Sequence, residues 1–219
     1  MTQLLLVRHA QASFGTDDYD RLSELGWRQA RWLGEYFAER NIAFDRVVRG
    51  SLRRHAETLA GIGEGLGAAL AHEEDAGFDE YDSHALLRAY SGSEIAQGND
   101  RREHFRLLRS ALYAWTDGTL ALEPEERFEA FRGRVLAALG AIRAQEAKRV
   151  LLVSSGGPIS TILAEVLGMP ARGVVDLNLQ TRNTGISELQ SGASRIHCVS
   201  FNNVPHLDRP ERASALTYS

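Results

Sequence analysis

The chain has a single cysteine, Cys198, among its 219 residues. No internal disulfide can form, so the fold does not depend on an oxidising compartment. No apolar run is long enough to span a bilayer. The N-terminal "MTQLLLVRHA" has an apolar run of only four residues with no basic lead, which excludes a signal peptide. We therefore expect a cytoplasmic protein with no membrane partner.

Lysine is almost missing too, because Lys148 is the only lysine among 25 basic residues. The formal charge is −4, and no basic run or stripe stands out, so we expect no nucleic-acid partner. Arginine binds phosphate through two parallel hydrogen bonds, which directs attention to individual arginines. The 43% apolar and 25% charged composition is typical of a globular protein.

The order of the predicted elements indicates an α/β three-layer sandwich, with a mainly parallel central sheet between helices. "QLLLV", "FDRVVRGS" and "RVLLVSS" are predicted buried strands, and helical segments follow each of them. Ser23 is a predicted helix cap, and Pro124 is predicted in the first turn of a helix with an apolar face. "VVDLNLQTRNTGISELQ" and "SRIHCVSFN" alternate like later strands, with a turn at 183–185.

The length suits one domain, which we place at residues 1–204. Residues 82–123 are less regular and mostly helical in composition, and they are predicted to form an insertion that caps a site. Residues 205–219 are polar and contain prolines, which predicts a loosely held C-terminal tail. "GIGEGLG" at 61–67 ends a helix and does not follow a strand, so it is not a nucleotide-binding loop.

Polar side chains follow the predicted strands where ligands bind in such sheets, at their carboxyl ends. Arg8 and His9 come directly after the first strand, and Ser155 follows "RVLLVS". Residues 49–54, with Arg49, Arg53 and Arg54 among them, follow the second strand and open the next helix. Three loops therefore deliver arginine, histidine, serine and backbone N–H groups to one edge of the sheet, where they form an anion site.

At this point the sequence resembles a family. "LLLVRHAQAS", "LSELGWRQA", "GSLRRHAETL", "FDEYD" and "LLVSSGGPI" have the order and rough spacing of the histidine phosphatase superfamily, in its phosphoglycerate-mutase-like branch. The resemblance covers roughly residues 3 to 190. It implies that His9 is the nucleophile that becomes phosphohistidine, that Arg8 and Arg54 bind phosphate, and that Glu80 protonates the leaving oxygen. Ser155 stands where the family has its second histidine.

The chemistry is sound on physical grounds alone. Two guanidinium groups neutralise the non-bridging oxygens of a phosphoryl group. A neutral imidazole is a good nucleophile near pH 7, and a carboxylic acid beside the leaving oxygen accelerates its departure by ~10²–10⁴-fold. We expect no metal and no cofactor, since no H-E-x-x-H or paired C-x-x-C spacing is present.

Three positions depart from the family pattern. Ala10 replaces a glycine, and Gly15 stands where the mutases carry a phosphate-binding asparagine. Ser155 lacks the charge of a histidine, and by analogy with oxyanion-hole deletions this costs ~10²–10³ in rate. The Gly156 amide remains as a donor at a helix start. His84, four residues after Glu80, is our candidate to replace the lost imidazole.

The predicted activity is hydrolysis of a small-molecule phosphomonoester, with a homodimer as a further expectation. The alternatives are a phosphate-binding or regulatory relative with little turnover, and a mutase-type phosphotransferase. A serine hydrolase is a minor alternative, because Val153 replaces the first glycine of G-x-S-x-G. Glu80 also fits an acidic surface loop. The remaining histidines are interpreted as surface or packed residues: His55, His72, His104, His197 and His206.

Overall fold

The computed structural model describes residues 1–13, 20–92, 101–120 and 126–218. Within these residues, six strands form one sheet in the order β3-β2-β4-β1-β5-β6. Neighbouring strands from β3 to β1 run parallel, whereas β5 and β6 are antiparallel to their neighbours. The predicted mainly parallel sheet is therefore confirmed. The strands are β1 (Thr2–Arg8), β2 (Arg46–Arg49), β3 (Glu73–Glu74), β4 (Arg149–Ser154), β5 (Ile186–Ser191) and β6 (Ile196–Asn203).

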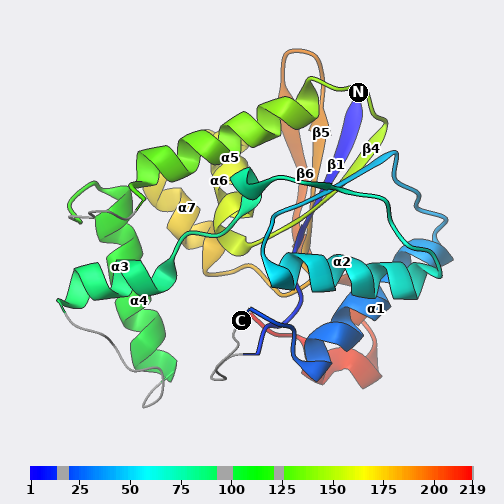
Figure 1. Ribbon diagram of the computed structural model, residues 1–219, viewed down its shortest axis with the longest axis horizontal. Helices are drawn as coiled ribbons and strands as arrows, with labels where there is room; N and C mark the ends of the chain where they lie inside the picture. Colours follow the sequence, from blue (N-terminus) through cyan, green and yellow to red (C-terminus); the bar gives the residue numbers. More distant parts are fainter. Residues whose placement is uncertain (14–19, 93–100, 121–125, 219) are drawn as a thin grey trace.

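Helices cover both faces of the sheet, which confirms the three-layer sandwich (Figure 1). One face carries α1 (Glu24–Glu39) and α2 (Arg53–Leu66), and the other carries α5 (Phe128–Arg143), α6 (Gly156–Leu167) and α7 (Ala171–Asn178). The predicted helical insertion supplies α3 (Ser83–Ser91) and α4 (Arg101–Thr116). These two helices pack against each other, and α4 also contacts α7.

The core lies on both faces because side chains alternate along each strand. In β1, Leu5 and Val7 pack toward α1 and α2, whereas Leu4 and Leu6 pack toward α5 and α6. All four side chains are buried, which explains the continuous apolar run that predicted this strand. The predicted apolar face of α5 is likewise buried, and it consists of Phe128, Phe131, Val135, Leu139 and Ile142.

Glycines bring α1 and α2 unusually close together. A Cβ on Gly34 would lie 2.1 Å from the Ile62 carbonyl oxygen, and a Cβ on Gly65 would lie 2.0 Å from the Arg31 carbonyl oxygen. The glycine-rich stretch of residues 61–67 therefore packs two helices and ends one, since Gly67 closes α2 with φ of 71°. This packing fixes the start of α2, which carries part of the site.

Two sequence-based predictions of secondary structure are wrong. The segment "VVDLNL" is not a strand. Its first five residues end α7 and Leu179 is the C-cap, and Val174 and Val175 pack into the core from one face of the helix. The predicted loose tail is instead packed for residues 205–218, which include η2 (Pro205–Leu207) and η3 (Pro210–Ala215). Gln29 anchors this segment by donating to the Ala215 carbonyl oxygen at 2.7 Å. Pro124 lies outside the described residues.

In the parts of the chain that the structure describes, none of the helices has the length and apolar character needed to cross a bilayer.

We predict that Ser23→Ala lowers the free energy of unfolding by ~1 kcal/mol, because the predicted cap is present. The Ser23 side chain accepts a hydrogen bond from the Gly26 N–H at 3.0 Å, at the start of α1. Urea denaturation of the two proteins measures the difference. Ser23→Thr keeps the hydroxyl and is expected to retain most of the stability. An equal loss in both variants would show that the cap contributes nothing.

Candidate active site

Five of the predicted site residues line one cavity of about 510 Å³: Arg8, His9, Arg54, Glu80 and His84. Arg8 ends β1 and His9 follows it, Arg54 lies in the first turn of α2, and Glu80 follows η1 (Ala76–Phe78). The carboxyl ends of parallel β1, β2 and β4 meet at this edge, and this explains why residues far apart in sequence converge here. Ser155 caps α6 beside them and is fully buried.

The His9 imidazole has a defined orientation. Its Nδ1 lies 2.8 Å from the Ala10 carbonyl oxygen, which can only accept a hydrogen bond. Nδ1 therefore carries the proton, and Nε2 keeps its lone pair as a nucleophile or base. Burial lowers the pKa of His9 well below its usual value, and the charges of Arg54 and Arg8 lower it further. The imidazole is thus neutral at neutral pH and in mild acid.

Hydrogen bonds and an ion pair hold the two arginines in place. The Arg8 guanidinium donates to the Thr181 carbonyl oxygen at 2.6 Å and to the Tyr218 carbonyl oxygen. The Arg54 guanidinium forms an ion pair with Asp20 at 2.6 Å. Both side chains are less than one-tenth exposed, at 9% and 8% of their residue surfaces. Their charges therefore act on the cavity with little screening by water.

Glu80 is a carboxyl group with weakened acidity. Its Oε2 accepts a hydrogen bond from the Gly157 N–H at 3.1 Å, at the start of α6. Burial raises the pKa of Glu80, although this hydrogen bond and the two arginines partly oppose the shift. A raised pKa keeps a larger fraction of the carboxyl group protonated, which suits a proton donor. Glu80 therefore lines the same cavity as His9 and does not lie in an exposed acidic loop.

Gly157 is needed for this arrangement. A Cβ at this position would lie 2.1 Å from Glu80 Oε1 and 2.8 Å from the Tyr81 ring. Gly156 is similarly confined, since its Cβ would lie 2.1 Å from Asn178 Oδ1. The two glycines of "SSGG" let side chains reach the N-terminus of α6, where backbone N–H groups attract negative charge.

Ser155 contacts a histidine to which the sequence analysis gave no role. His55 Nε2 lies 2.7 Å from Ser155 Oγ, and Arg54 donates to the same oxygen at 3.4 Å. The His55 ring also lies near His9, with ring centroids 5.9 Å apart. One signal was present in the sequence, since His55 directly follows Arg54 in the block that opens α2.

The outer wall of the cavity comes from the insertion. His84 of α3 and His104, Phe105 and Arg109 of α4 line it. His84 is exposed, and its proposed replacement of the missing imidazole stays a prediction. Gly15, which bears on the mutase alternative, lies outside the described residues. The wall combines apolar and basic groups, so it can contact the organic part of a ligand.

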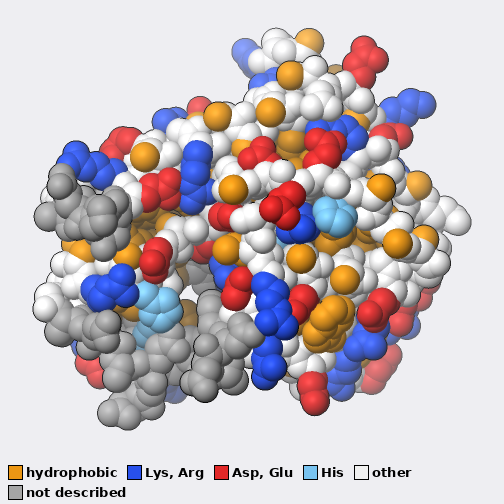
Figure 2. Space-filling view, viewed as in Figure 1, with side chains coloured by type: hydrophobic (Ala, Val, Ile, Leu, Met, Phe, Trp, Pro, Cys, Tyr) orange, Lys and Arg blue, Asp and Glu red, His pale blue; other side chains and the backbone are white. Residues whose placement is uncertain are grey.

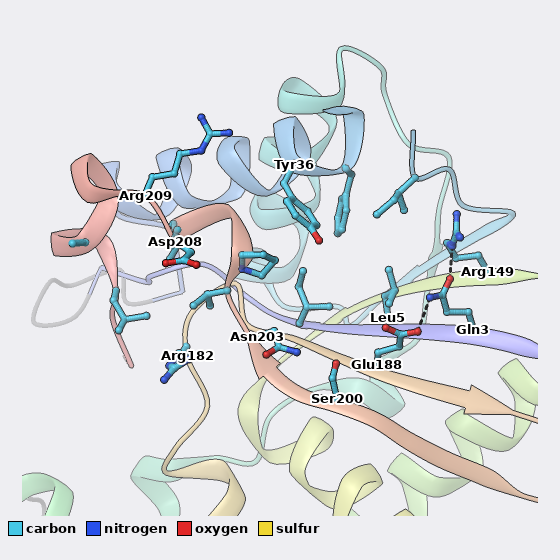
Figure 3. Close-up of a pocket in the computed structure, with 18 of the residues that line it drawn as sticks. Gln3, Leu5, Tyr36, Arg149, Arg182, Glu188, Ser200, Asn203, Asp208 and Arg209 are labelled. Carbon is cyan, nitrogen blue, oxygen red and sulfur yellow. Dashed lines mark hydrogen bonds between the residues drawn. The ribbon is translucent and has the colours of Figure 1, made fainter. Parts of the chain in front are cut away.

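A second cavity, of about 920 Å³, is separate from this one (Figure 3). It opens between α1, the β5–β6 edge of the sheet and the C-terminal segment, with Tyr36, Glu188 and Arg209 around it. Its lining among the described residues shares nothing with the site of His9. Size alone therefore does not identify the functional cavity, which is marked by its converging charges.

No metal-ligand group competes with this site in the described residues, and charges of both signs are mixed on the face that Figure 2 shows. Figure 2 shows acidic and basic side chains interspersed over the face that Figure 1 presents. Within residues 1–13, 20–92, 101–120 and 126–218, no three His, Cys, Asp or Glu side chains are grouped in a way that would hold a metal ion.

Comparisons with known proteins agree with this geometry. The model of the histidine phosphatase superfamily (branch 1) matches residues 4–204. The comparison with curated proteins found no match. Among solved structures, a phosphoserine phosphatase mutant from Entamoeba histolytica has a TM-score of 0.68 at 20% identity, covering 94% of this chain and 100% of that one.

Two further structures have the same fold. A mycobacterial glucosyl-3-phosphoglycerate phosphatase has a TM-score of 0.68 at 23% identity, covering 92% of this chain and 99% of that one. A putative alpha-ribazole-5'-P phosphatase from Escherichia coli has a TM-score of 0.70 at 19% identity, covering 93% and 98%. At these identities the likeness concerns the fold.

We predict that Gly157→Ala destabilises the protein by about 1–3 kcal/mol, because the added methyl group overlaps Glu80 and Tyr81. Gly133→Ala is the matched control, since Gly133 lies in α5 with nothing within 4 Å of the new Cβ. That change is expected to stabilise the helix by up to ~1 kcal/mol. Chemical denaturation compares the two variants. A Gly157→Ala protein as stable as the wild type would contradict the predicted crowding.

Proposed function

The chain belongs to the histidine phosphatase superfamily (branch 1), and from this membership and the geometry of the site we propose that it is a metal-independent phosphomonoester hydrolase. The observation that carries the proposal is the state of His9. Its neutral imidazole holds its proton on Nδ1, and the two buried arginines lie beside it. This combination suits attack on a phosphoryl group whose charge the arginines neutralise.

In the first step, His9 Nε2 attacks phosphorus, and the bond between phosphorus and the ester oxygen breaks. Arg8, Arg54 and the Gly156 amide hold the phosphoryl oxygens. Ser155, expected from the sequence to bind them too, acts through Arg54 instead, because His55 and Arg54 occupy its hydroxyl group. Glu80 donates its proton to the departing oxygen, so an alcohol leaves and phosphohistidine remains. The raised pKa of Glu80 supports this assignment, because a larger fraction of the carboxyl group is protonated.

In the second step, water attacks the phosphohistidine. Glu80 is now a carboxylate, and it takes a proton from the attacking water. The bond between phosphorus and nitrogen breaks, His9 returns to its neutral form, and inorganic phosphate is released. The same carboxyl group thus acts as acid and then as base.

Hydrolysis is favoured over the two alternatives. A binding relative needs no proton donor, whereas Glu80 lies in the same cavity as His9 with a raised pKa. A mutase must retain a doubly phosphorylated intermediate, and the asparagine that the resemblance implies is replaced by Gly15. We further propose a small-molecule substrate whose organic part contacts the wall from α3 and α4, a cytoplasmic location and a homodimer.

We predict that His9→Ala abolishes hydrolysis of an aryl phosphate, a loss on the order of 10⁶-fold if no other group replaces the nucleophile. The wild type is expected to form a phosphoenzyme that is labile in acid and stable in base, trapped by rapid quenching. His72→Ala, a change at an exposed histidine, is the control and keeps the wild-type rate. Turnover by His9→Ala at the wild-type rate would refute the phosphohistidine route. An inactive wild type that binds phosphate would favour the binding relative.

We predict that kcat/KM falls as pH rises through the raised pKa of Glu80, because the proton donor is lost. On the acid side, His9 stays neutral below its usual pKa, so its protonation does not lower the rate near pH 6.5. Glu80→Gln is expected to remove the dependence of the rate on this carboxyl group. It should also slow alkyl phosphates by ~10²–10⁴-fold, and aryl phosphates less. Rate profiles of both proteins on both substrates measure this. An unchanged alkaline limb in Glu80→Gln would assign that limb to another group.

A further inference from the structure

His55 is a fully buried imidazole that the proposed reaction does not use. It lies in the first turn of α2, directly after Arg54. Its Nε2 lies 2.7 Å from Ser155 Oγ, and its ring centroid lies 5.9 Å from that of His9. A histidine buried this completely beside two arginines and a second histidine is costly unless its polar atoms are matched.

The opposite edge of the ring faces groups that accept hydrogen bonds. Nδ1 lies 3.7 Å from the Asp79 carboxylate, and the Gly50 carbonyl group also faces it and raises the pKa of His55. The ring fits closely, since a Cβ on Gly50 would lie 2.3 Å from Nδ1. By distance and angle, Nδ1 has no hydrogen-bond partner among the described residues. Because the groups nearest to it can only accept, we assign the proton of the neutral ring to Nδ1, which leaves Nε2 as an acceptor.

With this tautomer, each hydrogen bond around Ser155 has a defined donor and acceptor. The Ser155 hydroxyl donates to His55 Nε2, so its oxygen is left to accept from the Arg54 guanidinium at 3.4 Å. The other terminal nitrogen of Arg54 is held by Asp20 at 2.6 Å. The chain of hydrogen bonds therefore runs from Arg54 through Ser155 to His55, and it fixes the plane of a guanidinium group that binds phosphate.

Burial lowers the pKa of His55 well below its usual value, and the charges of Arg54 and Arg49 act in the same direction. A neutral ring adds no positive charge next to His9. It therefore lies next to the His9 ring without repelling the positively charged groups of the site. The imidazole reaches the space beside Ser155 from the neighbouring helix, at a position where the resemblance led us to expect a histidine on α6.

We propose that His55 is a positioning residue of the phosphoryl site: it fixes the Ser155 hydroxyl, which holds Arg54 in place, and its ring backs His9. This inference rests on the proposed function, because it assigns Arg54 and His9 to phosphoryl binding and transfer. Ser155 is then not simply a missing histidine, because Ser155 and His55 act together through their hydrogen bond.

The same side chains are arranged in the order of a serine hydrolase, with a carboxylate, an imidazole and a hydroxyl. Two observations favour the positioning role. Ser155 is fully buried, and the Asp79 carboxylate at 3.7 Å is too far from Nδ1 for a good hydrogen bond. Cleavage of a carboxyl ester by the wild type, lost in Ser155→Ala, would overturn the assignment.

The test measures binding of vanadate, a mimic of the phosphoryl group in transfer, by titration calorimetry. His55→Gln and His55→Met both fill the space of the ring, but only glutamine bonds to Ser155. We expect His55→Met to weaken vanadate binding about tenfold, as for loss of a hydrogen bond to a charged network. His55→Gln should recover most of the affinity. Equal affinity in His55→Met and the wild type would overturn the proposal.

A double-variant cycle separates the unit from two independent effects. Ser155→Ala is expected to weaken vanadate binding about as much as His55→Met, and the double variant no more than either. Effects that multiply in the double variant would contradict the hydrogen-bonded chain. His206→Gln is the matched control, since His206 is also buried and bonds a hydroxyl, that of Thr184, at 2.8 Å. It should keep the wild-type affinity for vanadate.

A rescue variant tests whether the position of the imidazole matters. Ser155→His combined with His55→Ala supplies the ring from α6 and removes it from α2, so it should recover most of the affinity that His55→Met loses. If this variant folds but its affinity for vanadate stays low, an imidazole at residue 155 cannot replace one at residue 55. The vanadate cycle does not require turnover. If the wild type hydrolyses no phosphate ester but the variants change vanadate affinity as expected, only the proposed hydrolysis is refuted. If the wild type is active but the variants do not change vanadate affinity as expected, only the role of His55 is refuted.

Discussion

Two guanidinium groups are almost completely withdrawn from water at one edge of the sheet, and the remainder of the site is arranged around their charge. Arg8 and Arg54 lie beside His9, so any further positive charge in this space is unfavourable. Both nearby imidazoles are therefore kept neutral, as the lowered pKa values of His9 and His55 indicate. Neutral imidazole is the reactive form, so the charge that attracts a phosphoryl group also prepares its acceptor.

The topology provides the contacts that make such burial tolerable. Parallel strands end at a common edge, and this brings Arg8, His9 and the start of α6 together. The C-terminal segment then closes over Arg8, which donates to carbonyl oxygens of Thr181 and Tyr218. These acceptors are backbone groups, so they depend on the path of the chain and not on the identity of the side chain.

Much of the fold and of the candidate site could be predicted from local patterns. The buried strand before Arg8 and the cap at Ser23 follow from short-range rules, because each depends on neighbours within a few residues. The helix α7 could not be predicted in this way. Its "VVDLNL" alternates as a strand does, and only packing against the core decides for a helix. The packed C-terminal segment was missed for a related reason, since its anchors lie far away in sequence.

His55 shows the same limit at the level of chemistry. From the sequence, Ser155 only stands where the family has its second histidine. His55 is one of several histidines without an assigned role. The two residues are 100 positions apart, and only the fold reveals that the Ser155 hydroxyl meets His55 Nε2 at 2.7 Å. A serine is small enough to leave room for a ring entering from α2, and Gly50 provides the space behind that ring.

Because Ser155 and His55 share one buried space, the effect of a substitution at either residue depends on the other. Placing a histidine at residue 155 while His55 is present would put two rings into space that now holds one ring and a hydroxyl, and overpacking of a buried site is itself destabilising. Loss of activity on that substitution would therefore say nothing about the chemistry of a histidine on α6. The size and charge of both residues have to be considered together, because the space beside Arg54 holds one neutral imidazole, and in our proposal that ring comes from α2.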